Sequence, residues 1–275
     1  MSKISPGAVF RQLHESSQLF IMPNPWDIGT TRIFSQSGFK ALATTSGGLA
    51  YSLGKRDGLG VSREEALKHT ADIVSATTLP VSADLENGYG DTPEEVEKII
   101  LDAANTGAAG CSIEDYTGKP ESPIYEHSLA VERIQAAYEA RLRLPEDFVI
   151  TARCEKFVWG QTDLDSVIER LKAFEQVGAD VLYAPAVEEF SDISLLAKEL
   201  NKPINVLIST PNLPYGIPEL EEIGISRVSV GSAIAQTAYG AAIDAVTEIS
   251  RSQTFTFLDS VIDYEKLESW FQEDR

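Results

Sequence analysis

Short apolar segments alternate with longer amphipathic segments along most of the chain, and this alternation limits the folds that it can adopt. Eight of the apolar segments have the composition of buried strands; they begin at Leu19, Ala41, Leu79, Gly110, Phe148, Asp180, Ile204 and Arg227. Parallel strands need a long crossover between them, usually a helix, and eight such units close into a barrel. The order therefore predicts a (β/α)8 TIM-type barrel of the α/β class.

Start and stop signals mark the helices between these segments. One helix is expected to begin after Thr92 as N-cap, with Pro93 at its first position, and to end at Gly107. Segments 163–178 and 216–224 repeat this order of signals. A doubly wound open sheet is the alternative fold, but no GxGxxG motif follows the first apolar segment.

The last part of the chain is too apolar for a lone surface helix. We expect residues 1–250 to form the catalytic barrel and residues 251–275 to form a C-terminal helical extension. Large apolar side chains recur in the extension, at Phe255, Phe257, Leu258, Val261, Ile262, Leu267, Trp270 and Phe271. Exposed together they would form an interface patch, so residues from about Thr237 onward are expected to pack on a neighbouring subunit. The alternative is that the tail folds across the bottom of its own barrel.

Charge and cysteine usage narrow the classes of partner. The formal charge is 23 − 42 = −19, which disfavours nucleic acid and anionic membranes as partners. No run of about 18 apolar residues suggests a membrane span, and the first residues lack the apolar core of a signal peptide. With two cysteines only, a cytoplasmic location is expected.

Acidic side chains gather where the predicted strands end, which is where TIM barrels place their functional groups. The third strand ends at Asp84 and Glu86, the fourth at Glu114, and the fifth at Arg153. Residues two apart on a strand share a face, so Asp84 and Glu86 are expected to converge. Carboxylates crowded at one mouth repel each other, and a divalent cation would relieve this repulsion.

The candidate metal ligands are all oxygen atoms, because the sequence has no cluster of cysteine and histidine. The predicted metal is therefore Mg2+, or alternatively Mn2+, with some acids binding it through water. Arg153 suits a substrate carboxylate, and Ser46 with the amides of Gly47 and Gly48 could cradle another oxyanion. The seventh strand leads to Asn212, a further candidate for substrate binding. A small polyanionic acid is the expected ligand.

Four stretches resemble the phosphoenolpyruvate mutase/isocitrate lyase superfamily. They are TTSGGLAYSLGKRDG, ADLENGYGD, AGCSIEDYTG and FVITARCEKF, in the same order as in that family, and the likeness runs from about Pro23 to about Gly240. The resemblance implies a (β/α)8 barrel that binds Mg2+ together with a 2-oxo acid or the enolate derived from one. It also implies exchange of the last helix between subunits, hence a homodimer or homotetramer.

The resemblance also implies roles for individual residues. The substrate-binding residues are Ser46, Gly47, Gly48 and Arg153. The metal ligand is Asp84, and further acids near the metal are Glu86 and Glu114. The implied catalytic residues are Asp57, Glu114 and Arg153.

One loop departs from the lyases of this family. They carry Lys-(Lys/Arg)-Cys-Gly-His after the fourth strand, whereas this chain reads YTGKPESPIYEHS. The two cysteines do not replace the missing thiol, since Cys111 lies within a strand and Cys154 is expected to point away from the mouth. The three histidines, His14, His69 and His127, are expected to be surface or structural residues.

The expected reaction follows from this departure. It is Mg2+-dependent cleavage of a C–C bond in a small 2-oxo dicarboxylate, as in oxaloacetate decarboxylases, through a metal-bound enolate. The alternatives are C–P bond chemistry by a phosphonomutase or phosphonopyruvate hydrolase, 2-methylisocitrate lyase-like cleavage, and a non-catalytic barrel that binds a small acid.

Overall fold

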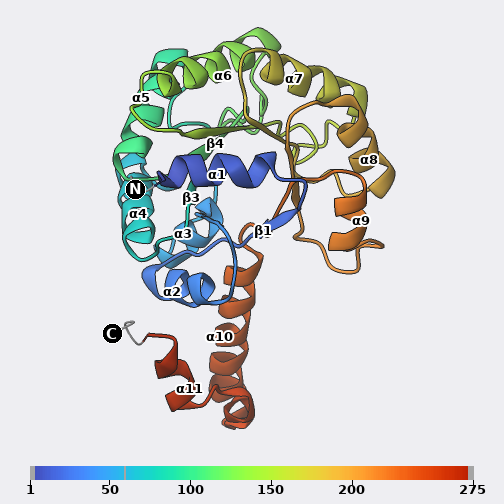
Figure 1. Cartoon of the computed structure of the whole chain (residues 1–275). Helices are drawn as coiled ribbons and strands as arrows, with labels where there is room; N and C mark the ends of the chain where they lie inside the picture. Colours follow the sequence, from blue (N-terminus) through green and yellow to red (C-terminus); the bar gives the residue numbers. More distant parts are fainter. Residues whose placement is uncertain (1–3, 59, 272–275) are drawn as a thin grey trace.

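The computed structural model describes residues 4–58 and 60–271, in which eight parallel strands form one sheet surrounded by helices (Figure 1). The strands are β1 (Phe20–Met22), β2 (Leu42–Ala43), β3 (Val81–Asp84), β4 (Gly110–Glu114), β5 (Val149–Arg153), β6 (Val181–Tyr183), β7 (Ile204–Leu207) and β8 (Arg227–Ser229). Their order is β1-β8-β7-β6-β5-β4-β3-β2. All eight predicted strands are present, and the predicted TIM-type α/β barrel is confirmed.

The two outer strands of this order, β1 and β2, meet at a seam that nearly closes the barrel. The amide of Ala43 donates to the Pro23 carbonyl at 3.1 Å. Just above it, the side-chain amide of Asn24 donates to the Thr44 carbonyl at 3.0 Å. These contacts join the strands where no regular ladder links them, so the ends of the strands form a continuous ring.

The helices follow the strands in the predicted alternation and surround the sheet (Figure 1). Those that follow the successive strands are α2 (Ile28–Gln36), α4 (Arg63–Ser75), α5 (Pro93–Asn105), α6 (His127–Arg141), α7 (Leu164–Gln176), α8 (Phe190–Glu199), α9 (Ile217–Glu222) and α10 (Ala233–Ser252). A further short helix, α3 (Ser46–Ser52), lies in the loop after β2. Thr92 caps α5 in a reciprocal capping box with Glu95, as its sequence indicates.

The N-terminal helix α1 (Pro6–Glu15) closes one end of the barrel, a feature that the sequence did not reveal (Figure 1). Its Phe10 is fully buried and belongs to a cluster with Phe20, Val149 and Val181, which lie near the N-terminal ends of their strands. Because this end is closed by apolar packing, the C-terminal end of the strands is the one left for a site.

The main hydrophobic cluster lies between the strands and the helices that cover them. Leu85, Ile99, Ile113, Ile150 and Phe174 are among its fully buried members. Both cysteines belong to the same cluster, as expected for side chains that point away from the barrel mouth. Among the described residues, no helix is both long and apolar enough to span a membrane.

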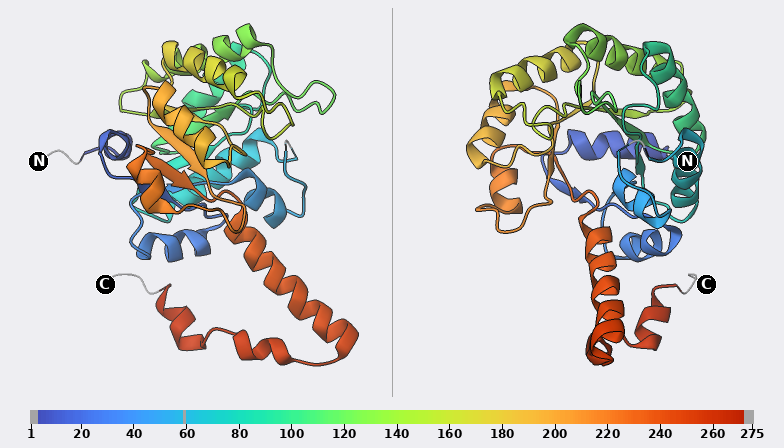
Figure 2. Two further views of the ribbon diagram at one scale, coloured as in Figure 1. Left: turned by 90° about the vertical axis from the view of Figure 1, so that its right-hand side faces the viewer. Right: turned by 180° about the vertical axis from the view of Figure 1, so that it is seen from behind.

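The C-terminal part of the chain projects away from the barrel (Figure 2). The 20-residue helix α10 leads outward, and the chain returns through η1 (Thr256–Ser260) and α11 (Tyr264–Ser269) to α2, where Gln36 donates to the Trp270 carbonyl at 3.0 Å. The boundary predicted at residue 250 thus falls inside α10, and residues 272–275 of the extension lie outside the described part. Phe255, Leu258, Val261 and Ile262 of the extension are exposed, and so are Ile243 and Val246 of α10, each 60% accessible.

His14 is a structural histidine on α1, and its environment predicts a pH-dependent stability. Burial and the nearby Arg227 charge lower the pKa of His14 from 6.5 to about 3. Between these values the unfolded chain binds a proton that the folded chain excludes. The stabilisation is therefore complete above about pH 6.5 and falls, by up to about 1.4 kcal/mol per pH unit, as the pH drops toward 3.

Urea unfolding at pH 7 and pH 5 tests this expectation. The native protein should lose about 2 kcal/mol more between these pH values than the His14→Gln variant, which has no proton to gain at this position. Equal losses in the two proteins would show that His14 has the same protonation in the folded and the unfolded chain over this pH range.

Candidate active site at the carboxyl end of the barrel

A cavity of about 230 Å3 runs into the barrel from the C-terminal ends of the strands. Five of the residues predicted from the sequence line it: Ser46, Gly47, Asp57, Asp84 and Arg153. The loop after β2, the end of β3 and the end of β5 supply these residues, as expected for a TIM barrel.

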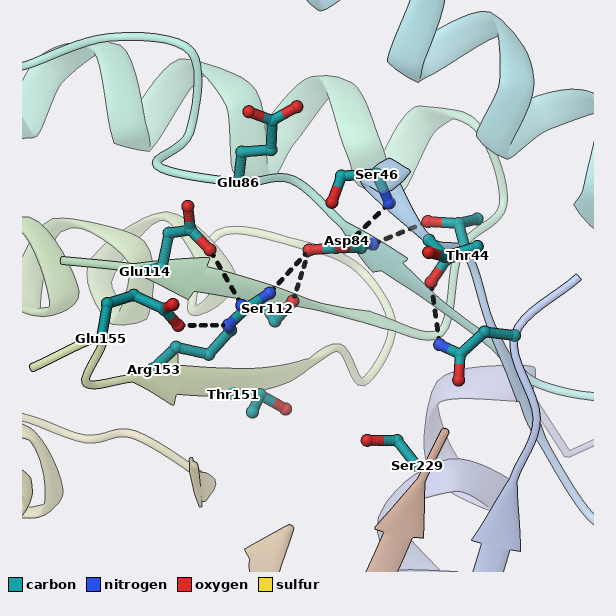
Figure 3. A network of polar contacts seen from close by, with 12 residues as sticks. Thr44, Ser46, Asp84, Glu86, Ser112, Glu114, Thr151, Arg153, Glu155 and Ser229 are labelled. Atoms are coloured by element: carbon teal, nitrogen blue, oxygen red, sulfur yellow. Dashed lines mark hydrogen bonds and ion pairs between the residues drawn. The ribbon is translucent and has the colours of Figure 1, made fainter. Parts of the chain in front are cut away.

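Asp84 ends β3 and is held by four neighbours (Figure 3). Its backbone amide donates to the Thr44 hydroxyl at 2.7 Å. One carboxylate oxygen accepts from the Ser46 amide at 3.0 Å, and the other accepts from Ser112 at 3.3 Å and from Arg153 at 3.1 Å. These contacts fix the orientation of a carboxylate at the cavity wall.

Arg153 lies between acidic side chains (Figure 3). Its Nε donates to Glu155 at 2.9 Å, its Nη1 to Asp84 at 3.1 Å, and its Nη2 lies 3.1 Å from Glu114. Its guanidinium also stacks over the Tyr183 ring at 5.0 Å. Each nitrogen thus has a carboxylate partner within the protein.

Glu86 does not share a strand face with Asp84, so the expectation that the two carboxylates converge is wrong. The strand β3 ends at Asp84, and Glu86 adopts a left-handed backbone with φ of 47°. Alternation of side chains applies only within a strand, and the Glu86 carboxylate points away from Asp84 (Figure 3). The Glu86 side chain is buried and accepts from the Tyr89 hydroxyl at 3.4 Å.

Several acids lie near Arg153, and the pKa values of three of their carboxyl groups are raised. Burial raises the pKa of Glu114 well above its usual value, with Arg153 opposing the effect and neighbouring acids adding to it. Burial also raises the pKa of Glu155. Asp57 is exposed as a whole residue, yet desolvation by the cavity wall and the Asp84 charge raise the pKa of its carboxyl.

The loop after β2 brings backbone amides and Asp57 together. Thr45 caps α3 by accepting from the Gly48 amide at 3.3 Å. A Cβ on Gly47 would stand 2.9 Å from an Asp57 oxygen and 3.1 Å from Ser232, so a larger residue would displace Asp57. The glycine therefore permits the close approach of loop and acid that the site requires.

Some predicted residues do not line the cavity. Gly48, Glu86 and Glu114 are buried outside its lining, and Asn212 is exposed on the loop after β7 with φ of 62°. Their roles stay predictions. Sequence reasoning also missed several polar residues that do line the cavity, namely Thr44, Ser82, Ser112, Tyr183, Asn205, Arg227 and Ser229. Polar residues at every second strand position, such as Asn205 and the pair Arg227 and Ser229, carried a signal for inward-facing polar groups.

The donor set suits a hard cation, although the structure does not gather the three predicted metal acids around one point. Within residues 4–58 and 60–271, no three acidic, cysteine or histidine side chains are arranged as a metal cluster. Arg153 stands between Asp84 and Glu114 instead. Mg2+ needs only one or two protein carboxylates and keeps its waters, so Asp84 at the cavity wall fits such an ion.

The sequence of this chain is similar to those of known proteins. The family described as phosphoenolpyruvate phosphomutase matches residues 10–250. The chain is 30% identical to 2-methylisocitrate lyase of Escherichia coli, over 74% of this chain and 70% of that protein. It is 26% identical to an oxaloacetate decarboxylase of Pseudomonas aeruginosa, over 90% of this chain and 84% of that one.

Two solved structures share the fold. A putative lyase/mutase from Burkholderia cenocepacia is 45% identical, with a TM-score of 0.93, and covers 97% of this chain and 95% of its own. A phosphonopyruvate hydrolase solved with oxalate and Mg2+ is 20% identical, with a TM-score of 0.85 over 98% of this chain and 95% of its own. At that identity the second likeness concerns the fold alone.

Proposed function

Because this chain belongs to the phosphoenolpyruvate mutase/isocitrate lyase superfamily, we propose that it is a Mg2+-dependent lyase that cleaves a C–C bond of a small 2-oxo dicarboxylate of the oxaloacetate class. The observation that carries the proposal is the chemistry of the cavity. Its described lining includes carboxylates, hydroxyls and arginines, but no thiol and no imidazole.

The lack of a thiol in that lining favours decarboxylation over the cleavage of 2-methylisocitrate. Cys111 and Cys154 are both buried in the main hydrophobic cluster. The loop from Thr117 to Glu126 carries no cysteine either. Decarboxylation of a 2-oxo acid needs an electron sink and a proton source rather than a thiol acid.

The residues at the cavity wall suit the steps of such a reaction. When bound at Asp84, Mg2+ would supply a Lewis acid that polarises the 2-oxo group. CO2 leaves without the electron pair of the broken C–C bond, and a proton added to the remaining carbon completes the product. The raised pKa of Asp57 suits it to hold that proton at the cavity mouth.

C–P bond chemistry is the second candidate function. The family that matches residues 10–250 is described as phosphoenolpyruvate phosphomutase, and a phosphono acid would present similar oxyanions to Ser46 and Arg153. A substrate panel separates the two functions. Oxaloacetate, phosphonopyruvate and 2-methylisocitrate are each assayed with Mg2+ and with EDTA.

We expect oxaloacetate to be turned over with Mg2+ and not with EDTA, yielding pyruvate and CO2 in equal amounts. Turnover of phosphonopyruvate alone would show that the second candidate function, C–P bond chemistry, is the correct one. Inactivity toward all three acids would contradict the proposed reaction class.

We also propose that the exposed apolar side chains of α10 and the tail form the contact between subunits of a homodimer or homotetramer. Ile243 and Val246 lie one turn apart on α10 and are largely exposed, so they offer one continuous apolar strip. Light scattering on a chain without residues 252–275, and on the Ile243→Glu/Val246→Glu variant, should give smaller particles. Asp244→Asn is the control on the same helix, and an unchanged mass for both altered proteins would exclude this interface.

A further inference from the structure

The floor of the cavity holds a buried arginine to which the proposed reaction assigns no role. Arg227 is the first residue of β8 and is 2% exposed, yet it is part of the cavity lining. Its Nη1 lies 3.1 Å from the Nε2 of His14 on α1, the helix that closes the N-terminal end of the barrel. The cavity therefore reaches an arginine that contacts α1 at the closed end.

Every described polar partner of this guanidinium is neutral. Its Nε donates to Asn205 at 2.8 Å, and its Nη2 donates to the Thr151 hydroxyl at 3.2 Å. The Nδ1 of His14 lies 2.8 Å from the Phe10 carbonyl and must donate to it, so its Nε2 accepts from Arg227 and the ring is uncharged. Burial without a counter-charge lowers the pKa of Arg227 to about 9.

Such a charge is costly to bury, and one other buried arginine of the chain is compensated by an acid. Arg170 is also buried and forms an ion pair with Asp115 at 2.9 Å. An isolated charge in the interior loses its hydration without compensation. A guanidinium has five N–H groups, and the three contacts of Arg227 leave two for a further acceptor.

The position of Arg227 defines how long a ligand must be to reach it. Arg227 contacts Thr151, which lies two residues before Arg153 on β5. At about 3.3 Å per residue, the two levels are about 6.6 Å apart along the strand. Ser82, Ser112 and Ser229 also line the cavity. A four-carbon diacid has the length to place one carboxylate at each level.

We propose that Arg227 binds the distal carboxylate of the substrate at the cavity floor and so selects four-carbon dicarboxylates over monocarboxylates. This inference rests on the proposed function for the choice of substrate class, because that function places the 2-oxo group of the acid at Asp84. The overall charge of the chain is negative, so an uncompensated cation inside the barrel supplies the local attraction that a second carboxylate needs.

The test compares two unreactive acids, malate and 2-hydroxybutanoate, which differ only in the distal carboxylate. Calorimetric titrations with Mg2+ present give the affinity of each for the native protein, Arg227→Gln and Arg227→Lys. The Arg143→Gln variant removes the same charge from an exposed position and is the matched control.

We expect the native protein and Arg143→Gln to bind malate about 10- to 100-fold more tightly than 2-hydroxybutanoate, the scale of a hydrogen-bonded charge pair. Arg227→Gln should bind the two acids equally, with unchanged affinity for 2-hydroxybutanoate. Arg227→Lys should keep a reduced preference, and it carries the test if the glutamine variant does not fold.

Two results would overturn the subsite. One is a native protein with no preference for the diacid, and the other is a preference that survives in Arg227→Gln while only its melting temperature changes. Decarboxylation of oxaloacetate is assayed separately. If the preference for malate depends on Arg227 but no substrate of this class is turned over, the subsite stands and the proposed reaction fails.

Discussion

The Asp84→Asn variant is expected to lose metal-dependent turnover by a factor of about 10^3, because a metal ion contributes several kcal/mol of charge stabilisation to the transition state. Asn has the size of Asp but only one acceptor oxygen, so it can keep the contact with the Ser46 amide or the contact with Arg153 but not both, and thermal melting is measured to show that the barrel stays folded. The substitution removes the negative charge that would hold the cation, together with the ion pair between Asp84 and Arg153.

Calorimetric titration of Mg2+ into the native and variant proteins checks this expectation directly. Asp72→Asn is the matched control, because Asp72 is a surface acid that pairs with Lys68 on α4. Unchanged Mg2+ affinity in Asp84→Asn would mean that another residue is the principal ligand.

The Arg153→Lys variant is expected to lose about 2–5 kcal/mol of transition-state stabilisation, the scale for disrupting a buried charged pair. The guanidinium reaches Glu155, Asp84 and Glu114 with three separate nitrogens, and a lysine has one. The substitution preserves the charge but releases at least one carboxylate, so the acids at the mouth should shift their positions.

Steady-state kinetics on the turned-over substrate, together with thermal melting, check this prediction. The kcat/KM should fall by roughly 30- to 4000-fold, the same free energy expressed as a rate ratio. Arg141→Lys is the control, since Arg141 forms a comparable ion pair with Asp180 away from the cavity. Normal kcat/KM in Arg153→Lys would leave Arg153 with a structural role only.

The local signals in the sequence predicted the elements well because their physical causes are local. Thr92, Pro93 and Gly107 bound α5 as expected, since capping and backbone conformation depend on neighbouring residues. The eight strand segments followed from hydrophobic pattern alone. The same rule failed at Glu86, where a left-handed residue ended the alternation that the prediction assumed.

The sequence by itself determined the eight-stranded barrel and the stretches from which Ser46, Asp57, Asp84 and Arg153 reach one cavity. Only the tertiary structure decided which charges are compensated. It placed Arg153 among three carboxylates and left Arg227 among neutral groups contributed by α1, β5 and β7. The reason is that the energy of a buried charge depends on atoms brought together from distant segments, whose distances no local pattern encodes.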